Sequence, residues 1–182
     1  MNDQVIVLLS GGIDSAACAA AAKERARARC MFVDYGQPAA EREKNAADQI
    51  CGALSIPLTA ITVSAHANFG VGEILGRNAF LVLTALMFGD VRDGEIMIGI
   101  HSGTPYYDCM PAFLVSMNRL VGEYTDGRTR VVAPFLGQSK LQIVEYLRRT
   151  VIRTEMTYSC EAGTQTPCGR CMSCRDRKTL GC

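Results

Sequence analysis

The sequence predicts an α/β domain with a doubly wound, mostly parallel sheet, followed by a small cysteine-rich knuckle. Three observations support this prediction. Apolar runs alternate with helical patterns along residues 5–149, as in strand–helix–strand units with right-handed crossovers. A glycine turn joins the first apolar run to an alanine-rich helix, and four closely spaced cysteines lie near the C-terminus. We expect residues 1–156 to form the sheet domain and residues 157–182 the knuckle.

Each predicted element follows from its apolar pattern and from the residues that bound it. Continuous apolar runs between turn residues favour buried parallel strands, and a helical period favours helices. The strands are expected at residues 5–9, 29–34, 57–63, 95–100 and 130–134. The helices are expected from about residue 14 and at residues 39–54, 77–91, 109–124 and 140–149. The chain ends soon after the knuckle, so no terminal helix is expected.

Composition excludes several classes of protein. The 182 residues suffice for one domain with a sizeable core and a small appendage. A net charge of +1 supplies no global field to hold a nucleic acid. The N-terminal apolar run is too short for a membrane span, and it follows Asp3 rather than basic residues, unlike a signal peptide. We therefore expect a soluble, cytoplasmic protein with no membrane partner.

The glycine turn is predicted to cradle the phosphates of a nucleotide. Its glycines let the backbone approach an anion, and the helix that starts near Asp14 adds its positive N-terminal end. Ser10 and Ser15 can donate hydroxyl hydrogen bonds, while Asp14 either caps the helix or holds Mg²⁺. The turn lacks the P-loop pattern of kinases and GTPases. The residues of the turn are Ser10, Gly11, Gly12, Ile13, Asp14 and Ser15.

The nine cysteines fall into two groups. Four follow the pattern C-x7-C-x2-C-x2-C, and four thiolates held by short loops suit tetrahedral zinc. Because all four positions are thiols, none is left for substrate, and the predicted role of zinc is structural. A disulfide conflicts with the expected cytoplasmic location. The predicted ligands are Cys160, Cys168, Cys171 and Cys174. Cys18, Cys30 and Cys51 are predicted core residues, and Cys182 is not a predicted ligand.

Five ordered motifs carry a resemblance to a known family. The glycine turn resembles the PP-loop of ATP pyrophosphatases, which cut ATP between the α and β phosphates. Over nearly the whole chain, the motifs resemble those of the 7-cyano-7-deazaguanine synthases. They are the glycine turn, Asp34-Tyr35-Gly36-Gln37, Gly76-Arg77-Asn78, Tyr107-Asp108-Cys109 and the cysteine knuckle.

The resemblance implies a reaction and its cofactors. ATP would adenylate 7-carboxy-7-deazaguanine, ammonia would attack the adenylate, and the amide formed would be converted into a nitrile. The implied cofactors are ATP, Mg²⁺ and structural Zn²⁺, and the implied assembly is a homodimer. The catalytic set would be Asp14, Arg77 and Lys140, with the two cations neutralising phosphate charge. Either cation could instead be an ordinary surface residue. The ATP site would add Asp34, Tyr35 and Asn78 to the glycine turn.

Tyr107, Asp108 and His101 are the expected substrate-binding residues. The Asp108 carboxylate can accept from both the ring N–H and the exocyclic amine of the deazaguanine, or it can cap the following helix. His101 is either a proton acceptor for the amine or a polar loop residue. Cys109 is predicted to be a packed thiol, because adenylate chemistry needs no nucleophilic cysteine.

The chain also departs from the family pattern. The loop before Gly76 is short, Met110 stands where the family has arginine, and residues 101–105 replace an acidic loop. One alternative is therefore the same adenylation with transfer to another amine, on a protein or a nucleic-acid component, as in an antiviral defence system. An inactive nucleotide-binding interaction module and a tRNA sulfur transferase are further alternatives. The small basic cluster at residues 170–178 is more typical of a solvated face than of a nucleic-acid site.

Overall fold

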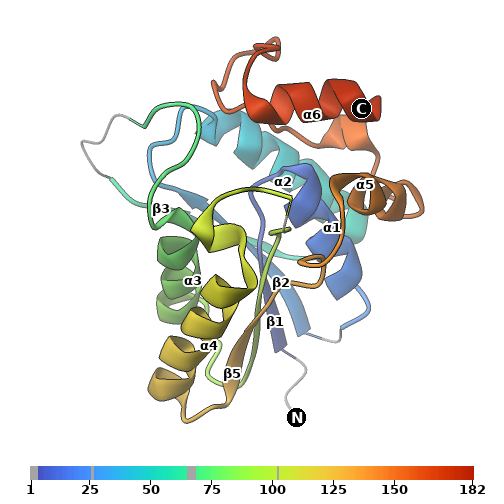
Figure 1. Cartoon of the computed structure of the whole chain (residues 1–182). Helices are drawn as coiled ribbons and strands as arrows, with labels where there is room; N and C mark the ends of the chain where they lie inside the picture. The colour runs from blue at the N-terminus through green and yellow to red at the C-terminus, as the bar shows by residue number, and fades with distance from the viewer. Residues whose placement is uncertain (1–3, 26, 65–68, 102) are drawn as a thin grey trace.

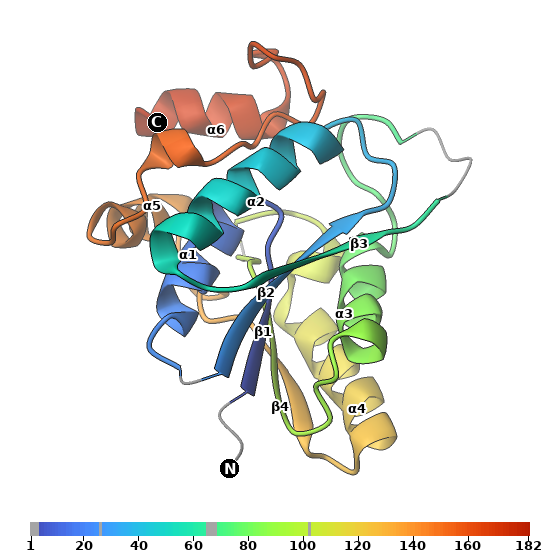
Figure 2. The same cartoon turned by 180° about the vertical axis from the view of Figure 1, so that it is seen from behind.

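The computed structural model describes residues 4–25, 27–64, 69–101 and 103–182, and it confirms the predicted α/β architecture. Within these residues, five parallel strands form one sheet in the order β3-β2-β1-β4-β5, with helices on both faces (Figure 1, Figure 2). The strands are β1 (Gln4–Leu8), β2 (Arg27–Asp34), β3 (Leu58–Thr62), β4 (Gly94–Ile98) and β5 (Thr129–Val132). The helices are α1 (Ile13–Ala22), α2 (Ala40–Leu54), α3 (Arg77–Phe88), α4 (Pro111–Thr125), α5 (Lys140–Arg148) and α6 (Met172–Leu180), with short 3₁₀ helices at η1 (Tyr107–Cys109) and η2 (Thr154–Met156).

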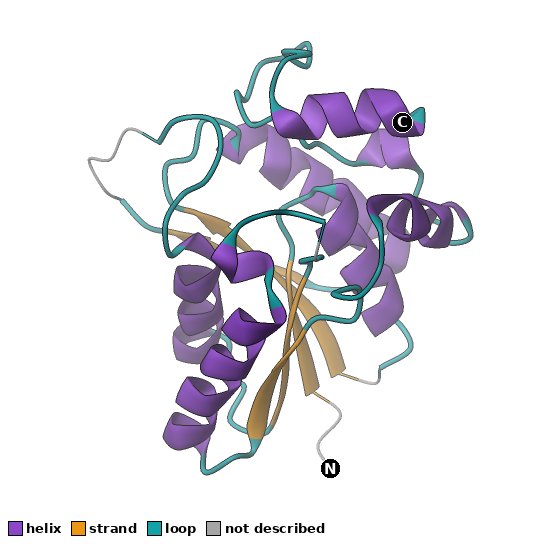
Figure 3. Ribbon diagram, in the orientation of Figure 1, coloured by secondary structure: helices purple, strands orange, loops and turns teal. Residues whose placement is uncertain are grey.

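The alternation of side chains along the central strand separates two cores. Val5, Val7 and Leu9 point to the face covered by α1, α2 and α5. Ile6 and Leu8 point to the opposite face and pack with α3 and α4. Both helical layers are visible on either side of the strands (Figure 3). Because residues 5–8 of β1 are buried, with side chains in both cores, this run is continuously apolar instead of alternating.

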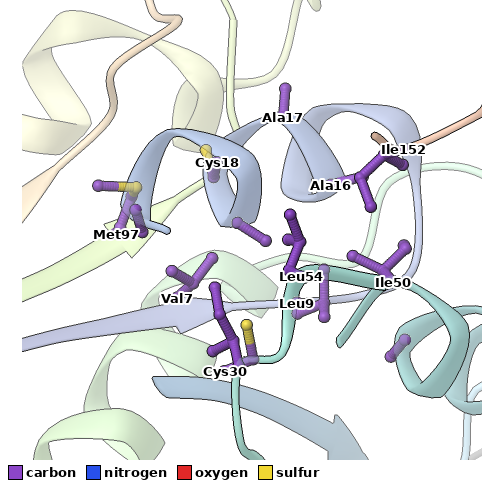
Figure 4. Packing of buried hydrophobic residues seen from close by; sticks show 14 of the residues in the cluster. Val7, Leu9, Ala16, Ala17, Cys18, Cys30, Ile50, Leu54, Met97 and Ile152 are labelled. Atoms are coloured by element: carbon purple, nitrogen blue, oxygen red, sulfur yellow. The ribbon is translucent and has the colours of Figure 1, made fainter. Parts of the chain in front are cut away.

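Alanines and thiols let α1 lie close to the sheet. Ala16, Ala17 and Cys18 are fully buried in the cluster that includes Val7 and Leu9 (Figure 4). Cys30 and Cys51 are buried in the same cluster, so the prediction of three core cysteines is confirmed.

The strand order creates one switch point at the centre of the sheet. The chain leaves β1 toward β2 on one side, whereas β4 pairs with the other edge of β1. Ligands of such sheets bind beyond the carboxyl ends of the strands at this point. A Cβ on Gly99, directly after β4, would lie 2.7 Å from the Ser15 backbone nitrogen. A glycine there lets the β4 end pack against the N-terminus of α1.

Two predictions about helices need correction. The absence of a terminal helix was wrong, because α6 begins inside the knuckle and lies at the end of the molecule opposite the start of β1 (Figure 1). Its sequence is polar on most positions, so no apolar period marks it. The helix expected from residue 109 begins at Pro111 instead, because proline suits the first helical turn.

One further helix ends earlier than predicted, and one loop lies partly outside the described residues. The helix expected to reach residue 91 ends at Phe88, before Gly89. The short loop before Gly76 includes residues 65–68, which are not described. No helix in the described part of the chain is long and apolar enough to cross a bilayer.

Candidate active site and four-cysteine cluster

Two adjoining cavities open at the carboxyl ends of the strands. The first has a volume of about 210 Å³ and carries most of the charged groups, and we call it the polar cavity. The second has a volume of about 120 Å³ and is lined by apolar side chains of β1, β2, α3 and β4 together with polar ones such as Gln37 and Asn78. We call it the apolar cavity after the side chains that the first cavity lacks. Their common wall contains Ser10, Ser15, Glu43, Arg77 and Gly99. The structure therefore brings the glycine turn and Arg77 together, as predicted from positions far apart in the sequence.

The two glycines of the turn are needed for different reasons. Gly11 has φ +77°, and a Cβ there would lie 2.5 Å from the Glu43 carbonyl oxygen on α2. Gly12 has φ −79°, and the heavy atom nearest to a Cβ there would be Ser10 Oγ at 3.5 Å. Gly11 is thus required by helix packing, whereas Gly12 keeps the floor of the polar cavity open.

The N-terminus of α1 is available for an anion. Gly12 is its N-cap residue, and no described side chain caps the helix. The first-turn backbone N–H groups of a helix have no partner within the helix, and they carry partial positive charge. Ile13, Asp14 and Ser15, which form this first turn, line the polar cavity. Ser10 Oγ and Ser15 Oγ lie 3.1 Å apart beside it.

Asp14 and Lys140 form an ion pair at the N-terminus of this helix. Lys140 Nζ lies 2.5 Å from Asp14 Oδ2, and the two side chains are 23% and 22% exposed. Lys140 is the first residue of α5, which a capping box at Ser139 starts. The second carboxylate oxygen, Asp14 Oδ1, is buried without a hydrogen-bond partner among the described residues. An unpartnered buried carboxylate oxygen suits Mg²⁺, which binds one or two carboxylates together with substrate phosphates.

His101 lies beside this pair with its ring orientation fixed. The backbone N–H of Gly103 donates to His101 Nδ1 at 3.1 Å, so the neutral ring carries its proton on Nε2. Nε2 lies 4.0 Å from Asp14 Oδ2. Burial lowers the pKa of His101, and the Lys140 ammonium lowers this pKa further while the Asp14 carboxylate opposes the change. The imidazole is therefore neutral near pH 7, and the nitrogen beside Asp14 is a hydrogen-bond donor.

Arg77 begins α3 at the wall between the cavities. Its Nε donates to Asn78 Oδ1 at 3.2 Å. Nearby on α2, Glu43 accepts a hydrogen bond from Gln37 at 2.9 Å, and burial raises the pKa of Glu43. Glu43 was missed in the sequence, because it lies within a charged helical stretch that looks like a solvated face. Tyr35 lines the apolar cavity, and burial raises the pKa of its phenol.

Three expected site residues do not reach either cavity. Asp108 is 8% exposed, and its Oδ2 accepts from the Asn78 backbone N–H at 3.4 Å, near the N-terminus of α3. Tyr107 is 56% exposed, and its hydroxyl lies 3.3 Å from Ser116 Oγ. Asp34 Oδ1 accepts from the Gly36 N–H at 2.9 Å in a local turn. None of the three lines a cavity.

Cys109 lines the polar cavity without the properties of a nucleophile. Burial raises the pKa of its thiol to about 11, and the neighbouring Asp108 carboxylate adds to the increase. A thiol with this pKa stays protonated and unreactive near neutral pH. This agrees with the predicted packed thiol.

The four knuckle cysteines converge as predicted. Their sulfur atoms all lie within 4.8 Å of one another, and Cys168 Sγ is 4.0 Å from Cys174 Sγ. Four thiolates about 2.3 Å from a zinc ion would be separated by about 3.8 Å, close to this arrangement. Backbone N–H groups of Cys168 and Cys171 donate to Cys160 Sγ and Cys168 Sγ, at 3.3 and 3.4 Å. The cluster could therefore hold one metal ion.

The knuckle forms one wall of the polar cavity. The Tyr158 N–H donates to the Gly11 carbonyl oxygen at 2.9 Å, so the chain before the first cysteine borders the glycine turn. Glu161 accepts from the Gly72 N–H at 3.0 Å and from the Ser173 backbone N–H at 3.2 Å. It thereby connects the segment before α3 with the start of α6. Glu161, Ser173 and Asp176 line the cavity.

The fold and the site define an α/β protein of parallel strands, with an anion-accepting helix N-terminus at the switch point and a four-thiol cluster beside it. The sequence model of the QueC family, described as queuosine biosynthesis protein QueC, matches residues 4–75 and 73–180. The chain belongs to this family.

Three relatives named 7-cyano-7-deazaguanine synthase match nearly the whole chain. The protein of Aquifex aeolicus is 32% identical, over 97% of this chain and 95% of the relative. That of a Synechococcus species is 32% identical over 97% and 93%, and that of Methanothermobacter thermautotrophicus is 29% identical over 96% and 92%. Among solved structures, NMN synthetase from Francisella tularensis aligns with a TM-score of 0.49 and 13% identity, over 91% of this chain and 69% of that one. This last likeness is too weak to bear on function.

Proposed function

We propose that this chain is an ATP-dependent ligase that adenylates 7-carboxy-7-deazaguanine and transfers the activated acyl group to ammonia. The observation that carries the proposal is the Asp14–Lys140 pair at the open N-terminus of α1. This arrangement places a carboxylate for Mg²⁺ and an ammonium for phosphate beside free backbone N–H groups. Membership of the QueC family and the names of the relatives support the choice of substrate.

The two cavities suggest how ATP and the acid would lie. The apolar cavity, with Tyr35 and Leu81, suits the adenine ring and its ribose. The glycine turn and Lys140 suit the β and γ phosphates, and Arg77 in the common wall suits the α phosphate. The remaining part of the polar cavity, toward α6, is then left for the deazaguanine acid.

The chemistry needs positioning and charge neutralisation rather than a nucleophilic side chain. The substrate carboxylate oxygen attacks the α phosphorus, and pyrophosphate leaves as an acyl-adenylate forms. Ammonia attacks the acyl carbon, AMP leaves, and a proton is lost to give the amide. With a second ATP, the amide oxygen attacks the α phosphorus, pyrophosphate leaves and the amide nitrogen loses a proton. Loss of AMP and of the second N–H proton then leaves the nitrile. Lys140 and the α1 N–H groups would stabilise the departing pyrophosphate, and Arg77 the charge on the α phosphate.

The two metals would have different tasks. Asp14 would hold Mg²⁺, which neutralises triphosphate charge when it is bound. The four knuckle thiolates would hold Zn²⁺, which would keep α6 against the cavity and take no part in the reaction. We also propose that the chain divides after residue 156, since the knuckle cysteines pack in a cluster of their own, apart from the two sheet cores.

Product analysis tests the proposal. Metal-loaded protein is incubated with ATP, Mg²⁺ and 7-carboxy-7-deazaguanine, with and without ammonia, and pyrophosphate and product masses are measured. We expect acid-dependent pyrophosphate and, with ammonia, the masses of amide and nitrile. A mass increment on an added protein or nucleic acid would favour the transfer alternative. Asp14→Asn should lose pyrophosphate release, whereas the control Asp126→Asn, exposed on the surface after α4, should keep it. Equal rates for both variants would remove Asp14 from the mechanism.

A further inference from the structure

The polar cavity contains one carboxylate without a partner in the described part of the chain. Four carboxylates line this cavity. Asp14 is paired with a lysine, and Glu43 accepts from a glutamine amide. Both oxygens of Glu161 accept hydrogen bonds, from backbone N–H groups and a serine hydroxyl. Asp176 makes no hydrogen bond or ion pair with any described residue.

Asp176 is held on the cavity wall by its helix, near enough to His101 for its carboxylate to oppose the lowering of the pKa of that imidazole. It lies on α6 one turn after Ser173, and both residues line the cavity. The next residue, Arg177, is engaged elsewhere, because its guanidinium donates to Thr157 and to the Thr154 carbonyl oxygen at 2.8–3.1 Å. Asp176 is half-buried and lines the cavity, so its carboxylate is partly removed from water.

An uncompensated carboxylate weakens any site that must hold a triphosphate and a carboxylic acid. It is useful there only if the ligand supplies hydrogen-bond donors to it. A guanine-like base does so along one edge, where the ring N1–H and the 2-amino group lie side by side. An ionised carboxylate is an acceptor only, with two oxygens that match two adjacent donors.

We propose that Asp176 recognises the N1–H and 2-amino edge of the deazaguanine acid and so determines which base is activated. This inference rests on the proposed function and assigns a residue to its substrate specificity. Asp108, the carboxylate expected at this edge from the sequence, lines neither cavity and is bonded to Asn78. With Asp176 at the α6 wall and Lys140 at the α1 wall, the base and the phosphates would occupy different parts of the same cavity.

The test compares two acids on the full, metal-loaded chain. One is 7-carboxy-7-deazaguanine and the other is its analogue without the 2-amino group. Pyrophosphate release is measured against the concentration of each acid and of ATP for wild type, Asp176→Asn and Asp176→Glu. Asp126→Asn is the matched control, since it makes the same chemical change outside both cavities. Bound metal and urea unfolding verify that each variant is folded.

The expected result is a selective loss of base recognition. For wild type, kcat/KM should be about tenfold or more higher with 7-carboxy-7-deazaguanine than with the analogue. A factor of this size corresponds to one charge-assisted hydrogen bond. Asp176→Asn should raise the KM of the acid about 10- to 100-fold and abolish this preference, with the KM of ATP unchanged within about twofold. Asp176→Glu, which keeps the charge, should retain part of the preference.

Several results would overturn the proposal. One is an unchanged KM of the acid in Asp176→Asn. Another is an equal increase in the KM of acid and analogue, which would leave the preference intact. A third is an increase in the KM of ATP alone. Calorimetric titration of the acid without ATP separates this inference from the proposed function. Binding that Asp176→Asn abolishes, without pyrophosphate release by wild type, would refute the ligase activity and keep the edge recognition. Absence of binding and turnover in wild type would refute both.

Discussion

Replacing each of the two adjacent glycines by alanine should separate stability from phosphate binding. Gly11→Ala places a Cβ at φ +77° and 2.5 Å from the Glu43 carbonyl oxygen, with Ala46 Cβ at 2.9 Å. Left-handed backbone costs a non-glycine residue about 1–2 kcal/mol, and overpacking costs about 1–3 kcal/mol. The lower entropy of the unfolded chain offsets about 0.4–1 kcal/mol. We expect Gly11→Ala to lower the free energy of unfolding by about 2–4 kcal/mol.

Gly12→Ala is the matched comparison. Its φ of −79° suits alanine, and the nearest heavy atom to the new Cβ is 3.5 Å away. We expect the free energy of unfolding to stay within about 1 kcal/mol of wild type or to increase slightly. The new methyl group would nevertheless enter the polar cavity where the phosphates are proposed to bind, so the affinity for ATP should fall.

Urea unfolding of the metal-loaded proteins measures both changes. Gly11→Ala should shift the midpoint strongly at an unchanged slope, because the slope reports the surface exposed on unfolding. Titration with ATP should show the larger loss for Gly12→Ala. The reasoning is refuted if both variants are equally destabilised, or if Gly11→Ala unfolds at the wild-type midpoint.

Four further variants or treatments test other parts of the site. Lys140→Met should slow pyrophosphate release at least about tenfold, because it removes both an ammonium group of the proposed phosphate site and the partner of Asp14. An unchanged rate would show that the Asp14–Lys140 pair takes no part in the reaction. Cys174→Ser should lower the bound metal, measured by elemental analysis, and the thermal midpoint, and full retention of metal would contradict four-thiol binding. Since the pKa of Cys109 is raised from 9.0 to about 11, iodoacetamide at pH 8 should label Cys182 and leave Cys109 unmodified. By the same shift, the folded chain keeps a proton that the unfolded chain releases, so stability should fall as pH rises from about 9 to 11. Cys109→Ala should make this fall smaller without removing it, because burial also raises the pKa of Cys18.

The predictable parts of this protein are those with a local chemical reason. The strand at β1 was predictable because burial on both faces makes residues 5–8 continuously apolar. The glycine turn and the convergence of the four cysteines were predictable because each depends on a few residue types at short spacing. The positions of Glu43 and Asp176 at the cavities were not predictable, since Glu43 lies in a charged helical stretch and Asp176 in a basic cluster, and both stretches look solvated. Only the tertiary packing of α2 and α6 brings them to the cavities.

Asp108 is the reverse case, a residue that was expected at the substrate site and that lines neither cavity. Its carboxylate had the right chemistry for the substrate edge and the right position in a family motif. The structure instead engages it with Asn78 at the start of α3, a contact across 30 positions of the chain that no local pattern contains.

Isotope transfer tests the central proposal most directly. 7-Carboxy-7-deazaguanine labelled with ¹⁸O in its carboxylate is incubated with the metal-loaded chain, ATP, Mg²⁺ and ammonia, and the AMP is analysed by mass spectrometry. Attack of the carboxylate on the α phosphorus predicts AMP that carries one ¹⁸O atom from the acid. Formation of ADP, or of AMP without the label, would show that the acid is not adenylated and would contradict the account.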